Sequence, residues 1–227
     1  MSEAMAMEHS DLTLADKETA GVNQNGQRLG TKGRRTRQRL IDVTVALLET
    51  HGLRDLTVAE VARTAETSPA TFYVYFEGVP EVVLAALETA EQSNPELMNL
   101  LKLDWCGSDG LAIARKFVRA YCDAWTVHRT VFRVRNLAAE EGDQRFLEAR
   151  HRAAQPILAA LMEPIKRAQD AGRVSKDLHT LSAAAAILTL LERLAAVTPL
   201  AQTDSGLTSA SLIDASAHMI AHILGAA

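Results

Sequence analysis

Helix-start signals set in a helical hydrophobic pattern constrain the fold of this chain most strongly. In residues 57–76, TVAEVARTAETSPATFYVYF, Thr57 lies three positions before Glu60, the spacing of a reciprocal capping box. Further along, Ser68 precedes Pro69, a pair typical of an N-cap followed by proline in the first helical position. The segment therefore predicts two short helices joined by a tight turn.

Helical periodicity also dominates the rest of the chain, and no alternating strand pattern bounded by turn residues interrupts it. A first helix is expected over residues 34–51, ended by a left-handed Gly52. Later helices are expected over residues 110–128, 131–139, 144–171, 181–197 and 207–224. Pro156 and Pro164 should kink or divide the longest of them. The prediction is an all-α fold.

Composition and cysteine count exclude several classes of protein. With 227 residues, 48% of them hydrophobic, the chain has enough apolar material for a buried core. No apolar run is expected to be long enough for a membrane span, and the N-terminus lacks the layout of a secretory signal, so we expect a soluble, cytoplasmic protein. Cys106 and Cys122 form no disulfide framework and no zinc-binding pattern.

The net charge of −4 hides a strong asymmetry. Residues 1–27 contain one lysine and five acidic residues, which accounts for the whole imbalance. Residues 28–40, RLGTKGRRTRQRL, contain six basic residues and no acidic one. A basic run of this kind is often only a solvated surface, but it also suits a nucleic-acid backbone.

The two short helices have the layout of a helix-turn-helix, in which the second helix enters the major groove of DNA. Phe72 and Phe76, spaced i, i+4, should anchor that helix to its neighbours. Tyr73 and the end formed by Ser68, Pro69 and Ala70 should then face DNA. The alternative, that the aromatics only fill a small core, suits the two phenylalanines better than Tyr73, whose hydroxyl would need a partner if buried.

Residues 36–87 resemble the TetR family of bacterial transcription regulators. The resemblance lies in an arginine-containing arm, a helix ending in HG, the segment LTVAEVARTAETSPATFYVYF, and the apolar start of a further helix at VPEVVLAAL. It implies a homodimer with an N-terminal DNA-binding domain and a larger helical C-terminal domain that binds a small ligand. We accordingly expect an N-terminal tail over residues 1–30, a helix-turn-helix domain over 31–79 and a ligand-binding and dimerisation domain over 80–227.

The resemblance also assigns roles in DNA binding. Four residues fall where family members touch the DNA backbone or support the recognition helix: Thr57, Thr71, Tyr73 and Tyr75. Four others occupy its outward positions: Ser68, Pro69, Ala70 and Val74. The chain departs from the family pattern at Glu66, where a turn glycine is usual, at Pro69 and Val74, where polar or basic residues are common, and at Val79, where lysine is frequent. We therefore expect the basic arm, Arg34, Arg35, Arg37 and Arg39 especially, to supply part of the phosphate contact.

Candidate ligand-binding residues lie in the second half of the chain. Phe117, Tyr121 and Trp125 recur every four residues along one predicted helix, a stripe that is either core or the lining of a ligand cavity. The remaining candidates are Phe132, Arg133, Asn136 and Glu192. Arg133 is either a solvated charge or a partner for an anionic ligand. Such a lining favours a hydrophobic or aromatic effector.

The last two predicted helices, rich in alanine and leucine, suit a four-helix dimer interface as well as a protein interior. Glu192 and Arg193 interrupt the apolar run, and one of them should face the ligand or pair across the dimer. His218 and His222 are spaced for a metal, but without a third ligand nearby in the sequence we expect a surface or interface role.

The sequence thus predicts a ligand-responsive regulator, specifically a repressor that binds a palindromic DNA operator as a homodimer and leaves it when the effector binds. An alternative is a helical small-molecule or acyl-chain binding protein with weak or lost DNA readout. The chain has no nucleophile elbow, no metal-binding histidine pair with an intervening glutamate and no glycine-rich phosphate loop, so we expect no catalytic residues, no metal and no cofactor.

Overall fold

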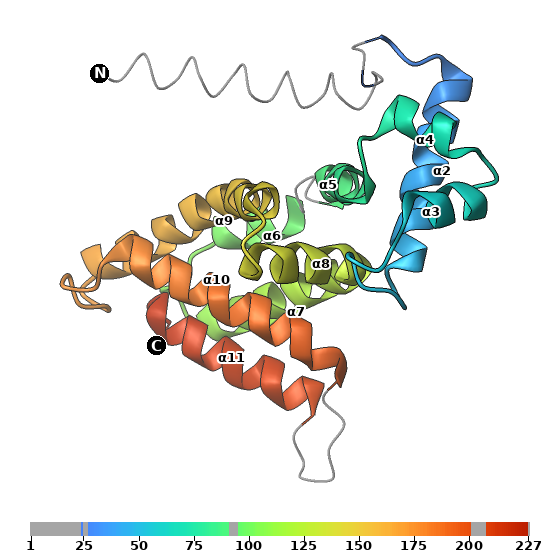
Figure 1. The fold of residues 1–227 in the computed structure, drawn as a ribbon. Coiled ribbons are helices and arrows are strands. Elements are labelled where there is room, and N and C mark those ends of the chain that lie inside the picture. The colour runs from blue at the N-terminus through green and yellow to red at the C-terminus, as the bar shows by residue number, and fades with distance from the viewer. Residues whose placement is uncertain (1–23, 25–26, 91–94, 201–207, 227) are drawn as a thin grey trace. The chain divides into compact units, whose positions relative to one another are not determined.

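Helices are the regular elements of this computed structural model, which describes residues 24, 27–90, 95–200 and 208–226 (Figure 1). No strand occurs in these ranges, which confirms the predicted all-α class. The chain forms two compact units that divide between Ala90 and Glu91. Each unit is described by itself.

The first unit contains four helices within its described residues: α2 (Thr31–Leu47), α3 (Val58–Thr64), α4 (Pro69–Tyr75) and α5 (Val79–Ala90). Helix α2 packs against α3 and α5, and α3 packs against α4. Leu40, Leu48, Val61 and Phe72 are fully buried where these helices meet. By packing, α5 belongs to this unit, although the domain boundary was expected after Val79.

The end of α2 differs from expectation. The helix ends at Leu47 with a right-handed cap at Leu48, and the backbone then turns through Thr50 and His51. Gly52 is not left-handed: among the described residues the glycines with positive φ are Gly142, Gly172 and Gly225. The prediction for Gly52 was wrong because the helix closes several residues earlier, so no left-handed residue is needed there.

The second unit consists of α6 (Pro95–Leu101), α7 (Gly110–Val127), α8 (Arg129–Glu140), α9 (Gln144–Asp170), α10 (Thr180–Val197), a short 3₁₀ helix (Thr198–Leu200) and α11 (Ser209–Ile223) in its described part. Helix α7 packs against α10 and α11, and α9 packs against α8 and α10. Helices α10 and α11 lie side by side (Figure 1). The hydrophobic core of this unit includes Phe117, Leu161, Ile187, Leu191 and Ile220.

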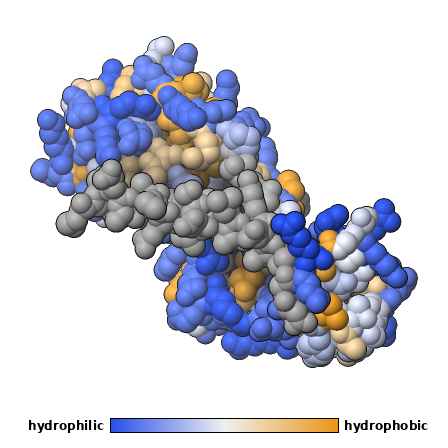
Figure 2. Space-filling view, turned by 90° about the horizontal axis from the view of Figure 1, so that it is seen from above, coloured by the Kyte–Doolittle hydropathy of each residue, from blue (hydrophilic) through white to orange (hydrophobic). Residues whose placement is uncertain are grey.

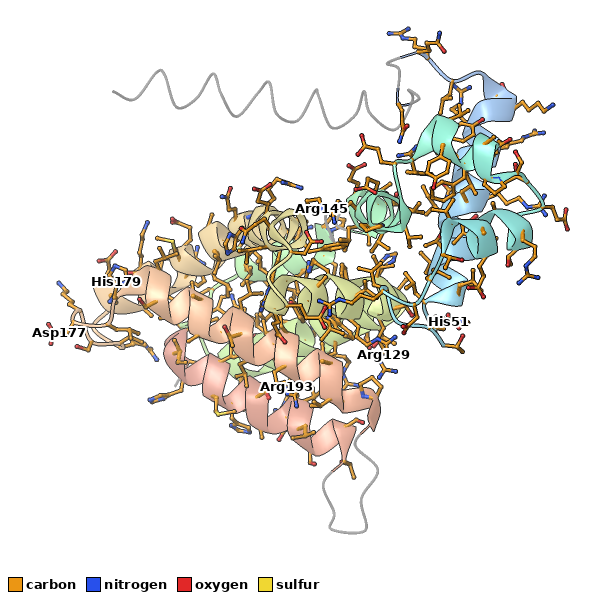
Figure 3. The ribbon with its side chains drawn as sticks, viewed as in Figure 1. His51, Arg129, Arg145, Asp177, His179 and Arg193 are labelled. Carbon is orange, nitrogen blue, oxygen red and sulfur yellow. The ribbon has the colours of Figure 1, made fainter. Side chains whose placement is uncertain are left out.

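Local signals account for several boundaries in this unit. Asp143 caps α9 by accepting a hydrogen bond from the Arg145 N–H, and His179 caps α10 by accepting one from the Ser182 N–H (Figure 3). The helix expected over residues 144–171 is confirmed: α9 ends at Asp170, and Gly172, just after it, is left-handed with φ of 69°. Pro156 and Pro164 do not divide α9, which continues through both.

Candidate nucleic-acid interface and effector site

Helix α3 begins at the predicted cap. Thr57 Oγ1 accepts a hydrogen bond of 3.2 Å from the Glu60 N–H, and Val61 and Ala62 on the inner face are buried. The reciprocal half of the capping box is not formed, because the Glu60 carboxylate lies 3.8 Å from His51 Nε2 instead. His51 follows the C-terminal end of α2 (Figure 3). The Glu60–His51 contact connects the start of α3 to the turn after α2.

Glu66 forms the turn between α3 and α4. Its φ of 52° is left-handed, the conformation for which glycine carries no steric cost. This is the position where the sequence already departs from the family pattern by lacking a glycine. The Glu66 carboxylate bonds Arg39 at 2.6 Å, but both side chains are largely exposed, so this ion pair contributes little stability.

Helix α4 has one anchored face and one exposed face, as predicted. Ser68 Oγ accepts from the Thr71 N–H at 3.1 Å, and Pro69 follows in the first helical turn. Phe72 and Phe76 are 0% and 4% exposed, with ring centroids 5.9 Å apart. Tyr73 is 52% exposed, and Val74 is 45% exposed. The helix is thus held by two phenylalanines, and its outer side chains are accessible.

The other candidates for DNA contact lie on or beside this exposed face. Ser68, Pro69 and Ala70 are exposed at the start of α4, and Thr57 is exposed at the start of α3. Thr71 and Tyr75 are half-buried. The Tyr75 hydroxyl lies beside Gly33 of α2, which supports a role in positioning α4 against α2.

The basic arm is largely helical, because α2 already begins at Thr31. Its arginines have different environments. Arg34 Nη1 donates to the Leu29 carbonyl at 3.0 Å, and the Arg37 guanidinium lies 5.1 Å from the Phe76 ring centroid. Burial lowers the pKa of Arg37, partly offset by the charge of Glu88. Arg35 is exposed on α2.

The aromatic residues Phe117 and Trp125 of α7 lie in two different environments. Phe117 is fully buried and packs edge-on against Trp105, with centroids 5.7 Å apart. Trp125 is 5% exposed and lies 6.0 Å from Phe132 of α8. The indole N–H of Trp125 is buried and has no hydrogen-bond partner among the residues described, whereas the Trp105 indole N–H donates to the Leu100 carbonyl at 3.1 Å.

Three charged side chains meet inside the second unit. Glu192 of α10 accepts from Arg135 of α8 at 3.2 Å and from Arg150 of α9 at 2.7 Å. The side chains of Arg135, Glu192 and Arg150 are 6%, 13% and 31% exposed. We call these three residues the charged cluster. Arg135 also lies over the Phe132 ring at 5.0 Å and donates to Asn136 Oδ1 at 3.0 Å.

Four of the seven predicted ligand-binding residues lie in or beside this cluster: Tyr121, Phe132, Asn136 and Glu192. Tyr121 is partly buried, and its burial together with the nearby Glu192 charge raises the pKa of the phenol. Phe132, Asn136 and Glu192 are direct neighbours of Arg135. Arg133, in contrast, is exposed, and Phe117 packs on the Trp105 side of α7. Glu192 rather than Arg193 points inward, since Arg193 is exposed on α10 (Figure 3).

Sequence reasoning missed Arg135 and Arg150. Arg135 lies four residues after Val131 and four before Ala139, both buried, so the apolar stripe of α8 indicated that a charge would be buried there. No comparable signal marks Arg150. Its partner Glu192 is 42 residues away in the sequence, and only the packing of α9 on α10 brings them together.

The outer faces of α10 and α11 remain partly apolar. Leu181 is 46% exposed, and Met219 is 50% exposed. Seen from above, the molecule has a mostly hydrophilic surface with scattered apolar residues (orange in Figure 2). By length and composition alone α10 would suffice to cross a membrane, whereas no apolar run of that length was expected. It instead packs against α7, α9 and α11, and its Glu192 is ion-paired.

The histidines of α11 do not form a metal site with the residues described. His218 Nε2 lies 3.7 Å from Asp214 Oδ2, and Asp214 bonds Arg115 of α7 at 2.6 Å. Arg115 lowers the pKa of Asp214 by this hydrogen bond. Within the described part of the chain, no group of three histidine, cysteine or acidic side chains could hold a metal ion.

Two family models match the two units. The model of bacterial regulatory proteins of the tetR family matches residues 40–86, and that of the tetracyclin repressor-like C-terminal domain matches residues 97–223. The second match alone covers more than half of the chain. Together with the exposed α4 and the helical C-terminal unit, these matches define the class: a helix-turn-helix transcription regulator. The chain belongs to the TetR family.

Individual relatives are distant. The HTH-type transcriptional regulator AqdR of Rhodococcus erythropolis is 33% identical over 69 residues, a match that spans 30% of this chain and 33% of that protein. The fatty acid degradation regulator FadR of Bacillus halodurans has a similar fold, with a TM-score of 0.61 at 15% identity, covering 86% of this chain and 97% of that one. SmeT, the repressor of the Stenotrophomonas maltophilia multidrug efflux pump SmeDEF, matches with a TM-score of 0.56 at 13% identity, covering 81% and 87%.

Proposed function

We propose that the protein is a cytoplasmic, ligand-responsive repressor that binds a palindromic operator as a homodimer. The observation that carries the proposal is the two-sided α4: Phe72 and Phe76 are buried, while Tyr73 and Val74 are about half exposed. A helix with that division presents a fixed outer face to a major groove. The exposed Ser68, Pro69 and Ala70 extend this face at the start of the helix.

The exposed faces of α10 and α11 support dimerisation. Only 33% of the apolar α10 is buried within the chain, and Leu181 and Met219 are about half exposed. Exposed apolar side chains on two adjacent helices suit an isologous interface, in which the same patch of each subunit meets its copy. A dimer would present two α4 helices to successive major grooves, about 34–36 Å apart.

Effector binding within the second unit would release the operator by favouring a conformation with a different spacing of the two α4 helices. The coupling expected for such a regulator is about 1–3 kcal/mol. Trp125 belongs to the core of the second unit, and Tyr121 and Phe132 pack against that core. An effector that packs against these three side chains would be hydrophobic or aromatic. This mechanism is an equilibrium between conformations and requires no catalytic step.

Selection of binding sites from a random duplex library, with the full chain at two salt concentrations, tests the proposal. Enrichment of an inverted repeat at both concentrations is expected. Weak binding without an enriched sequence, lost at the higher salt, would contradict it, because arginine–phosphate contacts alone are sequence-independent and salt-sensitive. That outcome would favour a small-molecule or acyl-chain binding protein without DNA readout.

A further inference from the structure

The charged cluster of the second unit has more cationic than anionic groups. One carboxylate, Glu192, bonds two guanidinium groups, Arg135 at 3.2 Å and Arg150 at 2.7 Å. The three side chains together are therefore cationic, and the Arg135 side chain is only 6% exposed. They come from α8, α9 and α10, so the packing of three helices brings this charge into one place.

Such an arrangement is costly in a protein interior. Desolvation of a charge is compensated only when opposite charge and hydrogen bonds replace the lost water. Arg150 shares its carboxylate partner, Glu192, with Arg135. A bound anionic group beside Arg150 would give this guanidinium a further partner, and guanidinium binds carboxylates through two parallel N–H donors.

A buried hydrogen-bond donor in the same unit, the Trp125 indole N–H, also lacks an acceptor among the described residues. The Trp125 ring lies 6.0 Å from Phe132, and the Phe132 ring lies 5.0 Å from the Arg135 guanidinium. Phe132 thus lies against both the Trp125 ring and the Arg135 guanidinium. Leaving a buried N–H without an acceptor is unfavourable, and a ligand oxygen would relieve it.

We propose that the effector is an organic monocarboxylate with an apolar or aromatic body, whose acidic group binds beside Arg150 and Arg135. One oxygen of the same acidic group accepts a hydrogen bond from the Trp125 indole N–H. The apolar body packs against Trp125, Phe132 and Tyr121. This inference rests on the proposed function only in that the second unit binds an effector, and it adds the chemical class of that effector.

Matched acids and amides test the proposal. Binding of 2-naphthoate, 2-naphthamide, decanoate and decanamide to the full-length protein is measured by isothermal titration calorimetry. At least one acid is expected to bind about 10-fold or more tightly than its amide, because only the acid adds a charge-assisted bond. Acids that do not bind, or that bind no more tightly than their amides, would overturn the proposal.

Two variants locate the carboxylate. In Arg150→Gln the cluster keeps Glu192 paired with Arg135 and becomes neutral, so the acid affinity should fall about 10- to 100-fold while that of the amide is unchanged. Arg152→Gln removes the same charge from an exposed site on α9 and should bind like the unchanged protein. Equal acid affinity in Arg150→Gln and Arg152→Gln would contradict the assignment.

Trp125→Phe provides a test in which the charged residues are intact. It keeps an aromatic ring and removes the indole N–H, so acid binding should weaken by about 5- to 10-fold. Trp105→Phe, whose indole N–H already has the Leu100 carbonyl as partner, is the matched control and should keep the acid affinity. An unchanged affinity in Trp125→Phe would remove Trp125 from the site.

Operator binding distinguishes failure of the carboxylate site from failure of the repressor function. If the protein binds a selected operator but prefers no acid over its amide, the proposed function stands and the carboxylate site is wrong. If the protein binds the acid through Arg150 but no specific DNA, the carboxylate site stands and the repressor function is wrong. Release of the operator by the preferred acid, and not by its amide, is the result expected from both together.

Discussion

At the scale of single residues, the two tryptophans of the second unit differ in one hydrogen bond. Trp105 Nε1 donates to the Leu100 carbonyl, while Trp125 Nε1 has no partner in the described part of the chain. Both rings are buried, at 1% and 5% exposure, so replacing either by phenylalanine removes a similar apolar volume. The indole N–H is therefore the main chemical difference between the two replacements.

We predict that Trp105→Phe lowers the free energy of unfolding by about 1 kcal/mol more than Trp125→Phe, because only the first breaks a hydrogen bond. Urea unfolding at one fixed protein concentration and without added ligand measures the difference. Equal destabilisation, or a larger loss for Trp125→Phe, would show that the Trp125 N–H is satisfied in the free protein.

Glu66 provides a second residue-scale prediction. Its φ of 52° is unfavourable for any side chain with a Cβ, and its ion pair with Arg39 is exposed. Glu66→Gly and Glu66→Ala both remove the ion pair, but only glycine relieves the backbone. We expect Glu66→Gly to be more stable than Glu66→Ala by about 0.5–1 kcal/mol in thermal unfolding. The opposite order would contradict the left-handed turn.

At the scale of elements, α2 presents its arginines unequally. Arg34 bonds the Leu29 carbonyl and Arg37 packs on Phe76, while Arg35 is exposed. We therefore expect Arg35 to provide a phosphate contact and Arg37 to act mainly by supporting α4. Arg37→Ala would then disturb α4 itself, which makes Arg35 the better choice for measuring phosphate contacts alone.

Arg35→Ala should flatten the slope of log affinity against log salt concentration by about 0.9 for each subunit bound to DNA. Titrations of labelled operator at several salt concentrations give this slope. Lys176→Ala, which removes an exposed cation from the second unit, is the control and should leave the slope unchanged. If the two variants give the same slope, Arg35 does not contact phosphate.

The α10–α11 pair carries a prediction about assembly. Met219 is 50% exposed on α11, and Leu103, outside these helices, is 45% exposed. Burial of a methionine side chain contributes about 1.5–3 kcal/mol, and a symmetric interface contains it twice. Met219→Glu should therefore weaken the dimer at least about 100-fold, while Leu103→Glu should not. Sedimentation velocity over a dilution series distinguishes these outcomes.

At the scale of the whole molecule, the features predictable from sequence are the local ones. The cap at Ser68, the anchors Phe72 and Phe76 and the stop at Gly172 each depend on residues within about one helical turn. The prediction of a left-handed Gly52 was wrong because the end of α2 depends on how the chain turns toward α3. The predicted division at Pro164 does not occur, since Pro164 is buried and α9 continues through it.

The charged cluster shows what sequence patterns do not contain. Arg135 and Glu192 are 57 residues apart, and Arg150 and Glu192 are 42 apart. No periodicity relates positions so distant, so their meeting depends on the packing of α8, α9 and α10. Glu192 itself was predicted as a ligand-binding residue because it interrupts an apolar run, but its two arginine partners were found only in the structure.

We propose that the exposed face of α4 reads DNA sequence in a dimer. The most direct measurement repeats the binding-site selection with Ala70→Ser and Val74→Ser beside the unchanged chain. We predict that at least one variant changes the preferred base at equivalent positions of both half-sites, because base contacts specify sequence whereas phosphate contacts only add affinity. Identical base preferences in all three proteins would contradict the claim.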